Sequence, residues 1–188
     1  MKTQYVTDGV LVRPFEQTAT RFLSSRFYDG RKVVDLLQST ESAQLWFEVM
    51  ARELDVVDVG TVSDAQLADL RSARDLVSTV YEAVMSGDFQ SAADGLTRLG
   101  KSVTVEPSFA STGAGVDVYF AAGGSAVDDF LAELLFSTAD TITPPNLSRL
   151  RKCDGPHCVL YYTQLRDGQQ WCSNTCGNRA RVARHARR

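Results

Sequence analysis

The sequence predicts an α+β protein: a mostly helical N-terminal domain with one β-hairpin, followed by a small cysteine-rich module. Helical spacing of apolar residues dominates the first part of the chain, and one central stretch alternates apolar and polar residues instead. All four cysteines of the 188 residues lie between positions 153 and 176. We therefore divide the chain into residues 1–146, a domain of ordinary size, and residues 147–188, a small addition.

Two helices are expected early in the first domain. The first begins at Pro14, which suits a first turn, and stops at Gly30. A short apolar run over residues 33–37 is too brief to assign. The second helix covers residues 39–54, where apolar side chains recur along one stripe.

Three further helices complete the helical pattern. The longest begins at Ser63, whose hydroxyl can accept from the first-turn amides while Gln66 reaches back, and it runs to Gly87. Shorter helices are predicted over residues 89–99 and 125–140, the second of them capped by a serine.

A β-hairpin interrupts this series of helices. Residues 101–107 and 115–121 alternate apolar and polar side chains around a Ser-, Thr- and Gly-rich link over residues 108–114. This pattern is typical of two antiparallel strands with one buried face. Pro144 and Pro145 cannot continue the last helix, so the domain boundary is expected there.

Composition and charge limit the class of protein. Hydrophobic residues make up 44% of the chain and charged residues 23%, which is typical of a soluble globular protein. No signal peptide or membrane span is predicted, so we expect a cytoplasmic location. Residues 1–148 carry 11 Lys+Arg against 21 Asp+Glu, a balance of −10, whereas residues 149–188 carry 9 against 2, a balance of +7. The basic end indicates a polyanionic partner or, alternatively, a solvated charged face.

The cysteine spacing is C-x4-C, then thirteen residues, then C-x3-C. Cytoplasmic thiols are kept reduced, so a metal site or a redox centre is expected rather than a disulfide framework. Two close pairs joined by a short connector suit tetrahedral zinc, and the C-x-x-C of redox centres is absent. Four thiolates close the coordination shell, so the zinc is expected to be structural. The predicted ligands are Cys153, Cys158, Cys172 and Cys176.

The predicted order within this module is knuckle, β-hairpin, helix. Residues 154–156 favour a turn between the first two cysteines, and the segments 159–162 and 169–171 can form two strands joined by a turn at residues 166–168. Ser173 can cap a helix that begins at residue 174.

Histidine is the other common zinc ligand, and the chain has two. With four cysteines available, His157 is expected to be a solvent-facing turn residue. His185 lies among arginines and is expected on a helix surface.

Residues 171–179, WCSNTCGNR, resemble the CGNR zinc-finger family. The family is named after the tetrapeptide Cys-Gly-Asn-Arg, which is residues 176–179 of this chain. The lead-in RLRKC over residues 149–153 is similar to that family's approach to its first cysteine. The layout of residues 1–146 resembles the ABATE domain that usually precedes this finger, notably in DLLQSTESAQLWFE (residues 35–48) and SAVDDFLAELL (residues 125–135). The resemblance implies a bacterial, stress-induced transcriptional regulator whose finger binds DNA and whose first domain binds a small-molecule effector. Gln169 and Gln170 depart from the family, which usually has basic residues there.

Basic side chains of the finger are the expected DNA contacts, because guanidinium groups fork onto phosphate or guanine. About five such contacts would give a log–log salt slope near −4 to −5. A lone finger reads few bases, so we expect a homodimer formed through residues 1–146. Asn178 either contacts adenine or makes a local hydrogen bond that fastens the knuckle. The candidate contacts are Arg151, Lys152, Arg179, Arg181, Arg184, Arg187 and Arg188.

Two other functions stay open. The basic helix could dock an acidic surface of another protein, or of its own first domain, in a zinc-stapled adaptor. An enzyme is the third alternative, but the sequence has no Gly-rich phosphate loop, no nucleophile elbow and no paired catalytic motif. We therefore expect a binding protein rather than an enzyme.

Overall fold

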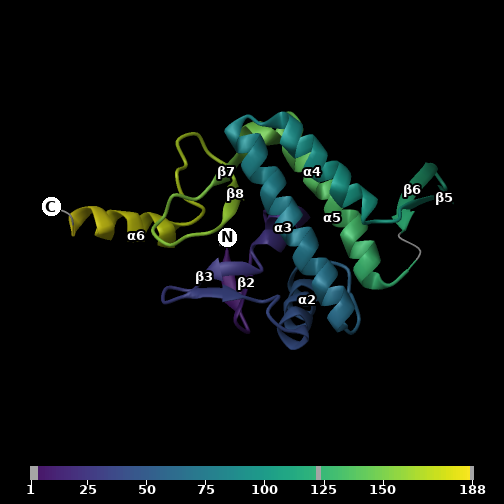
Figure 1. Cartoon of the computed structure of the whole chain (residues 1–188), viewed down its shortest axis with the longest axis horizontal. Coiled ribbons are helices and arrows are strands. Elements are labelled where there is room, and N and C mark those ends of the chain that lie inside the picture. Colours follow the sequence, from purple (N-terminus) through teal and green to yellow (C-terminus); the bar gives the residue numbers. More distant parts are fainter. Residues whose placement is uncertain (1–3, 122–123, 187–188) are drawn as a thin grey trace.

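The computed structural model describes residues 4–121 and 124–186. A bundle of helices forms the middle of the molecule, with the cysteine-rich module at one end and a two-stranded hairpin at the other (Figure 1). The predicted α+β class is confirmed. The first half of the chain contains β1 (Tyr5–Thr7), β2 (Val10–Val12), α1 (Thr18–Leu23), β3 (Arg26–Tyr28), β4 (Val33–Asp35), α2 (Thr40–Leu54) and α3 (Asp64–Ser86). The second half contains α4 (Phe89–Lys101), β5 (Glu106–Thr112), β6 (Gly115–Ala121), α5 (Ala126–Ile142), a 3₁₀ turn (Asn146–Arg149), β7 (Leu150–Lys152), β8 (Tyr161–Thr163) and α6 (Asn174–His185).

The longest helix, α3, begins and ends as predicted. The Ser63 hydroxyl accepts from the backbone N–H of Gln66 at 3.3 Å, and the Gln66 side chain accepts from the Ser63 N–H at 2.8 Å. Gly87 ends the helix with a φ of +82°, a left-handed conformation that glycine adopts without steric cost. The predicted helices α2, α4 and α5 are confirmed as well.

The first predicted helix is wrong over most of its length. Only α1 is helical, because the chain leaves the helix after Leu23 and pairs Phe27 with Val34 in the β3–β4 hairpin. Ser25 lies buried at this point, where its backbone oxygen accepts from the Leu36 N–H at 2.9 Å. Burial of Phe27 in the hairpin therefore outweighs the local helical spacing.

The β1–β2 hairpin was not predicted. Its two-residue turn consists of Asp8 and Gly9, with φ of +50° and +80°, which is typical of a type I′ turn. The Asp-Gly pair between YVT and VLV is a sequence signal for this hairpin, but the strands have only three residues each.

Aromatic side chains form the centre of the core. Phe22 of α1, Trp46 and Phe47 of α2, and Phe130 of α5 are almost fully buried. Their rings meet edge to face, with centroids of Trp46 and Phe47 at 4.7 Å and of Phe22 and Phe130 at 5.1 Å. Such pairs contribute about 0.5–1.5 kcal/mol beyond the burial of their area. This cluster joins three helices that are distant in sequence.

The central hairpin forms, but the bounds of its first strand and its burial differ from the prediction. Residues 108–112 of the expected link belong to β5, and the turn lies at residues 113–114. The expected buried face is wrong, because every residue of β5 is exposed and Phe109 is 68% exposed. The hairpin projects from one end of the helix bundle (Figure 1), which leaves β5 in contact with solvent.

The C-terminal module packs directly on the helical body. Leu150, Leu160, Tyr161 and Tyr162 belong to the same buried hydrophobic cluster as the body helices. The division between residues 146 and 147 stays a prediction, since burial is continuous across it. No helix within the described residues has the length and hydrophobicity to cross a membrane.

Candidate metal centre and its basic helix

A short antiparallel ladder positions the first two cysteines. Strand β7 pairs with β8, and the Cys153 N–H extends the ladder by donating to the Leu160 oxygen at 2.9 Å. Between them the chain turns back, and the Cys158 N–H donates to the Gly155 oxygen at 2.9 Å. The predicted turn between these cysteines is confirmed.

The module contains a β-hairpin, but the prediction of its strands is wrong for one of the two. Residues 169–171 are not a strand, and the partner of β8 is β7, which precedes the first cysteine. The Tyr162 hydroxyl donates to the Gln169 oxygen at 2.9 Å, which holds residues 164–170 as a loop. The predicted turn in that loop is present, with Gln169 N–H donating to the Arg166 oxygen.

The second cysteine pair lies at the start of a helix. Ser173 is the N-cap of α6, and its hydroxyl accepts from the Cys176 N–H at 3.3 Å, as predicted. Cys176 therefore lies in the first turn, where the helix dipole stabilises negative charge.

The four sulfur atoms meet at one point. All lie within 4.8 Å of one another, with 3.8 Å between the sulfurs of Cys158 and Cys172 and 3.5 Å between those of Cys172 and Cys176. Tetrahedral zinc with Zn–S bonds of about 2.3 Å places its sulfurs about 3.8 Å apart, so the donor set and the spacing fit zinc. Three of the cysteines are buried and Cys158 is half-buried. Bound zinc would supply a cross-link between the two cysteine pairs.

Contacts among the four thiols shift their pKa values in opposite directions. Hydrogen bonds from Cys158 and then Cys172 lower the pKa of Cys153 to about 7, and contacts led by Cys153 lower the pKa of Cys176. The hydrogen bond with Cys153 raises the pKa of Cys158 and of Cys172, because a thiol that donates to a neighbouring sulfur holds its proton more tightly. All four can ionise together only when a divalent cation compensates their charge.

Arg179, a predicted DNA contact, points inward. Its guanidinium donates to the Cys176 sulfur at 2.9 Å and lies 4.8 Å from the centre of the Tyr28 ring of β3. Burial by itself lowers the pKa of Arg179, but the contact with the Cys176 sulfur outweighs burial and the pKa is raised. Arg179 therefore joins α6, the sulfur cluster and the N-terminal part of the chain.

The basic lead-in to the first cysteine is also engaged within the protein. Lys152 forms an ion pair with Glu82 of α3 and lies over the Tyr161 ring at 5.6 Å. Arg151 is half-buried, and its guanidinium donates to the Leu150 oxygen at 2.8 Å.

The exposed arginines of α6 are Arg181 and Arg184. Arg181 donates to the side-chain oxygen of Asn178, so Asn178 makes a local bond within α6 and none to the knuckle among the described contacts. Arg187 and Arg188 lie outside the described residues.

Both histidines are exposed, as predicted. The metal cluster within the described residues consists of the four cysteines without either histidine. The His157 ring lies 5.2 Å from the Tyr28 ring, so it contributes to the same contact as Arg179.

A buried ion pair, missed by the sequence analysis, joins the module to the body. Arg13 is 1% exposed and donates to Glu16 at 2.8 Å and to the Tyr161 oxygen at 2.7 Å. The other carboxylate oxygen of Glu16 accepts from both the N–H and the hydroxyl of Thr163 at 2.9 Å. These partners are 147 and 148 residues apart, so the sequence carries no local signal for the contact.

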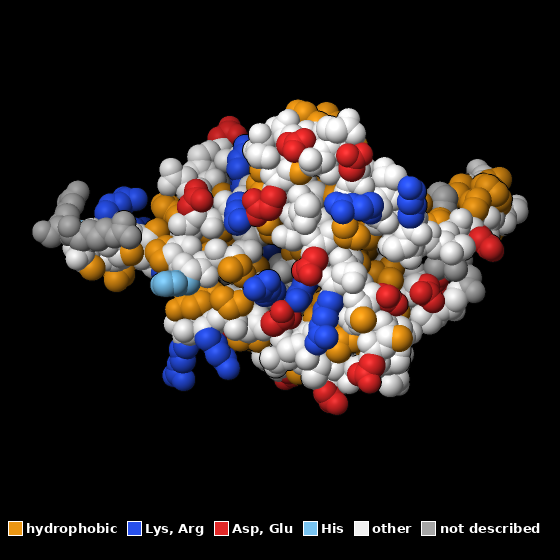
Figure 2. All heavy atoms as spheres, viewed as in Figure 1, with side chains coloured by type: hydrophobic (Ala, Val, Ile, Leu, Met, Phe, Trp, Pro, Cys, Tyr) orange, Lys and Arg blue, Asp and Glu red, His pale blue; other side chains and the backbone are white. Residues whose placement is uncertain are grey.

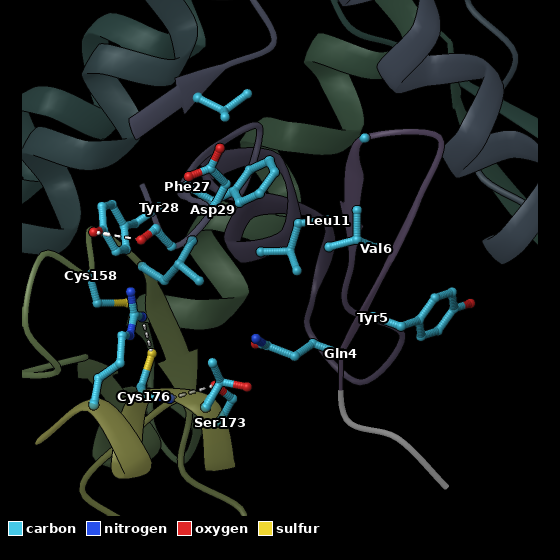
Figure 3. A pocket seen from close by; sticks show the side chains of 16 residues that line it. Gln4, Tyr5, Val6, Leu11, Phe27, Tyr28, Asp29, Cys158, Ser173 and Cys176 are labelled. Atoms are coloured by element: carbon cyan, nitrogen blue, oxygen red, sulfur yellow. Dashed lines mark hydrogen bonds between the residues drawn. The ribbon is translucent and has the colours of Figure 1, made fainter. Parts of the chain in front are cut away.

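Two hollows adjoin α6. A cavity of about 550 Å³ lies between the N-terminal hairpins and the sulfur cluster (Figure 3). Leu11 and Phe27 form part of its apolar wall, while Ser173 and Arg179 contribute polar groups. A more open groove of about 830 Å³ runs between residues 165–171 and the first turns of α6.

Two glycines permit this close packing. A Cβ on Gly177 would lie 3.1 Å from the Trp171 ring, and a Cβ on Gly155 would lie 2.9 Å from the Cβ of Cys176. The glycine of the CGNR tetrapeptide thus allows the tryptophan to cover the start of α6.

Replacing Gly155 with alanine is expected to weaken zinc binding about tenfold or more, because the added methyl group pushes Cys176 away from the other sulfurs at a cost of about 1–3 kcal/mol. Competition with a chromogenic chelator measures the affinity. Gly100→Ala is the control, since its Cβ would meet Leu135 at an ordinary 3.8 Å. Equal zinc affinity of the two variants would contradict the expectation.

The sulfur cluster, the ladder and the capped helix define a four-cysteine zinc-binding module. Residues 149–188 match the CGNR zinc finger family, which agrees with the resemblance of the sequence WCSNTCGNR. No curated protein matches the chain. The similarity of residues 1–146 to an ABATE domain stays a prediction.

Proposed function

We propose that the protein is a DNA-binding transcriptional regulator whose structural zinc centre fixes a basic helix for contact with duplex DNA. The observation that carries this proposal is the position of α6, which projects away from the acidic helical body (Figure 1) and exposes Arg181 and Arg184. Residues 149–188 have a balance of 9 basic against 2 acidic side chains. Attraction to phosphates supplies most of the affinity in such a contact.

The remaining parts of the protein have supporting roles in this proposal. The 550 Å³ cavity has the size of a small-molecule site and is the place we propose for an effector. A homodimer through residues 1–146 would present two fingers and so extend the sequence that is read. We propose a bacterial, cytoplasmic regulator in the response to stress, with no catalytic activity.

One observation favours the adaptor as a second candidate. The ion pair between Lys152 and Glu82 shows that a basic residue of the module docks on an acidic helix of the body. Arg181 and Arg184 would then bind an acidic surface of another protein.

Fluorescence anisotropy with labelled random-sequence duplex DNA over a salt series tests the proposal. The double variant Arg181→Gln/Arg184→Gln is expected to reduce the steepness of the log–log salt dependence by about 1.8, because each lost phosphate contact removes about 0.9. Both side chains are exposed, so zinc content and unfolding temperature are expected to stay unchanged. Absence of binding by the unaltered protein at low salt would leave the adaptor as the better candidate.

A further inference from the structure

We infer that the turn of the β3–β4 hairpin forms a second DNA-binding arm, in which Arg31 and Lys32 contact backbone phosphates beside the site of α6. The inference rests on the proposed DNA binding and extends the interface to the acidic N-terminal part of the chain. None of the DNA contacts expected from the sequence lies in this part of the chain.

The hairpin and the basic helix are held together by three aromatic and cationic side chains. Tyr28, the last residue of β3, lies 4.8 Å below the Arg179 guanidinium and 5.2 Å from the His157 ring. Asp29 and Gly30, which follow in the turn, line the same cavity as Arg179 (Figure 3). The turn therefore lies at the finger end of the molecule, beside the start of α6.

The turn has a fixed shape that leaves its cationic groups free. One carboxylate oxygen of Asp29 accepts from the backbone N–H of Arg31 at 2.7 Å and of Lys32 at 2.9 Å. Asp29 N–H donates to the Lys32 oxygen at 3.1 Å, and the Tyr28 hydroxyl donates to the Gly30 oxygen at 3.0 Å. Both basic side chains are exposed, and neither forms a salt bridge with a residue that the structure describes.

The charge of this segment is opposite to that of its domain. Residues 26–32 contain three basic side chains and one acidic side chain, whereas residues 1–148 as a whole have 11 basic against 21 acidic. Without that segment the balance of the domain would be 8 against 20. Figure 2 shows Lys and Arg side chains projecting at the finger end of the molecule. A polyanion that approaches α6 therefore meets a basic hairpin before it meets the acidic helices.

The arm also supplies positive charges in place of two basic residues of the finger that are engaged within the protein. Arg179 and Lys152 are engaged with the sulfur cluster and with Glu82. Arg31 and Lys32 restore two exposed positive charges on a backbone that the turn already fixes, so binding has to order only their side chains.

The test compares two double variants that remove the same charge. Arg31→Gln/Lys32→Gln removes the arm. Arg98→Gln/Lys101→Gln is the matched control, because these side chains lie in the last turn of α4, which leads into β5 at the opposite end of the molecule (Figure 1). Anisotropy with a labelled duplex over a salt series gives the slope and the affinity of each protein. Zinc content and circular dichroism show that each variant is folded.

We expect the arm variant to lower the steepness of the log–log salt dependence by about 1.8, because two phosphate contacts are lost. If the two proteins bind equally at 1 M salt, this change in slope makes the variant about 60-fold weaker in affinity at 0.1 M salt. The control is expected to keep the slope of the unaltered protein, and so is the charge-preserving Arg31→Lys/Lys32→Arg variant. Equal slopes for the arm variant and the control would overturn the inference while leaving the proposed function intact. If the unaltered protein fails to bind the duplex at low salt, the proposed function and the arm are both wrong.

Discussion

Replacing Cys176 with serine is expected to abolish stoichiometric zinc binding and to unfold the finger. Cys176 lies 3.5 Å from Cys172 and connects the start of α6 to the other sulfurs. A small module has too few apolar side chains to fold alone, and structural zinc contributes about 10 kcal/mol or more of apparent binding free energy. Elemental analysis of purified protein measures the zinc, and amide hydrogen exchange over residues 149–186 measures the folding of the finger.

Thr175→Ala is the matched control for this substitution. Thr175 precedes Cys176 in the first turn of α6, but it is exposed and supplies no sulfur. We expect this variant to bind one zinc ion and to keep the exchange protection of the unaltered protein. A Cys176→Ser protein with full zinc content and a protected finger would refute the four-cysteine centre.

Replacing Arg13 with methionine is expected to destabilise the protein by about 3–5 kcal/mol. The substitution leaves the Glu16 carboxylate, which is 9% exposed, without its cationic partner in the interior. It also removes the hydrogen bond to the Tyr161 oxygen that joins β8 to the body. Urea unfolding, followed by the fluorescence of Trp46 and Trp171, measures the change in the free energy of unfolding.

Arg52→Met is the matched control for Arg13. Arg52 also pairs with a carboxylate, Asp8 at 2.5 Å, but both side chains are more than half exposed. Exposed ion pairs contribute about 0–1 kcal/mol, so this variant should unfold nearly as the unaltered protein does. Similar losses for both variants would show that burial of the Arg13–Glu16 pair has no special effect. Adding Glu16→Gln to Arg13→Met is expected to recover part of the lost stability, since no unpaired charge then stays buried.

The buried joint also bears on the proposed DNA binding. Arg13, Glu16 and the pair of Lys152 with Glu82 attach the β7–β8 ladder to the helical body on two sides. Arg179 and Tyr28 attach the start of α6 to the β3–β4 hairpin. Several contacts thus hold the finger in place on the body. Such a fixed position would keep α6 and the β3–β4 turn at a constant spacing for the proposed contacts with DNA phosphates.

Local patterns predicted those elements whose determinants lie within a few residues. The capping box of Ser63 and Gln66 and the terminal Gly87 fixed the bounds of α3, because each of these residues acts on backbone groups at most one turn away. Ser173 predicted the start of α6 for the same reason. The cysteine spacing predicted the sulfur cluster because two close pairs of thiols joined by a short connector suit one tetrahedral zinc ion.

Local patterns failed where a distant contact decided the conformation. Residues 14–30 have helical spacing, yet Phe27 is buried in a strand because β4 and α3 supply its partners and those of Ser25. Residues 169–171 were expected to pair with β8, but β7 occupies that edge. The central hairpin has the alternation of a half-buried sheet, yet it projects beyond the helix bundle and every residue of β5 is exposed.

The sequence by itself thus determined the class of the protein, its five main helices in part or whole, and a four-thiol zinc centre with a basic helix. Only the tertiary structure decided which cations are free: it turned Arg179 toward Tyr28, paired Lys152 with Glu82, and brought the hairpin turn beside α6. The physical reason is the separation along the chain between the groups that interact. Caps, turns and paired cysteines act through neighbouring residues, whereas ion pairs and ring contacts join side chains whose separation along the chain leaves no pattern to read.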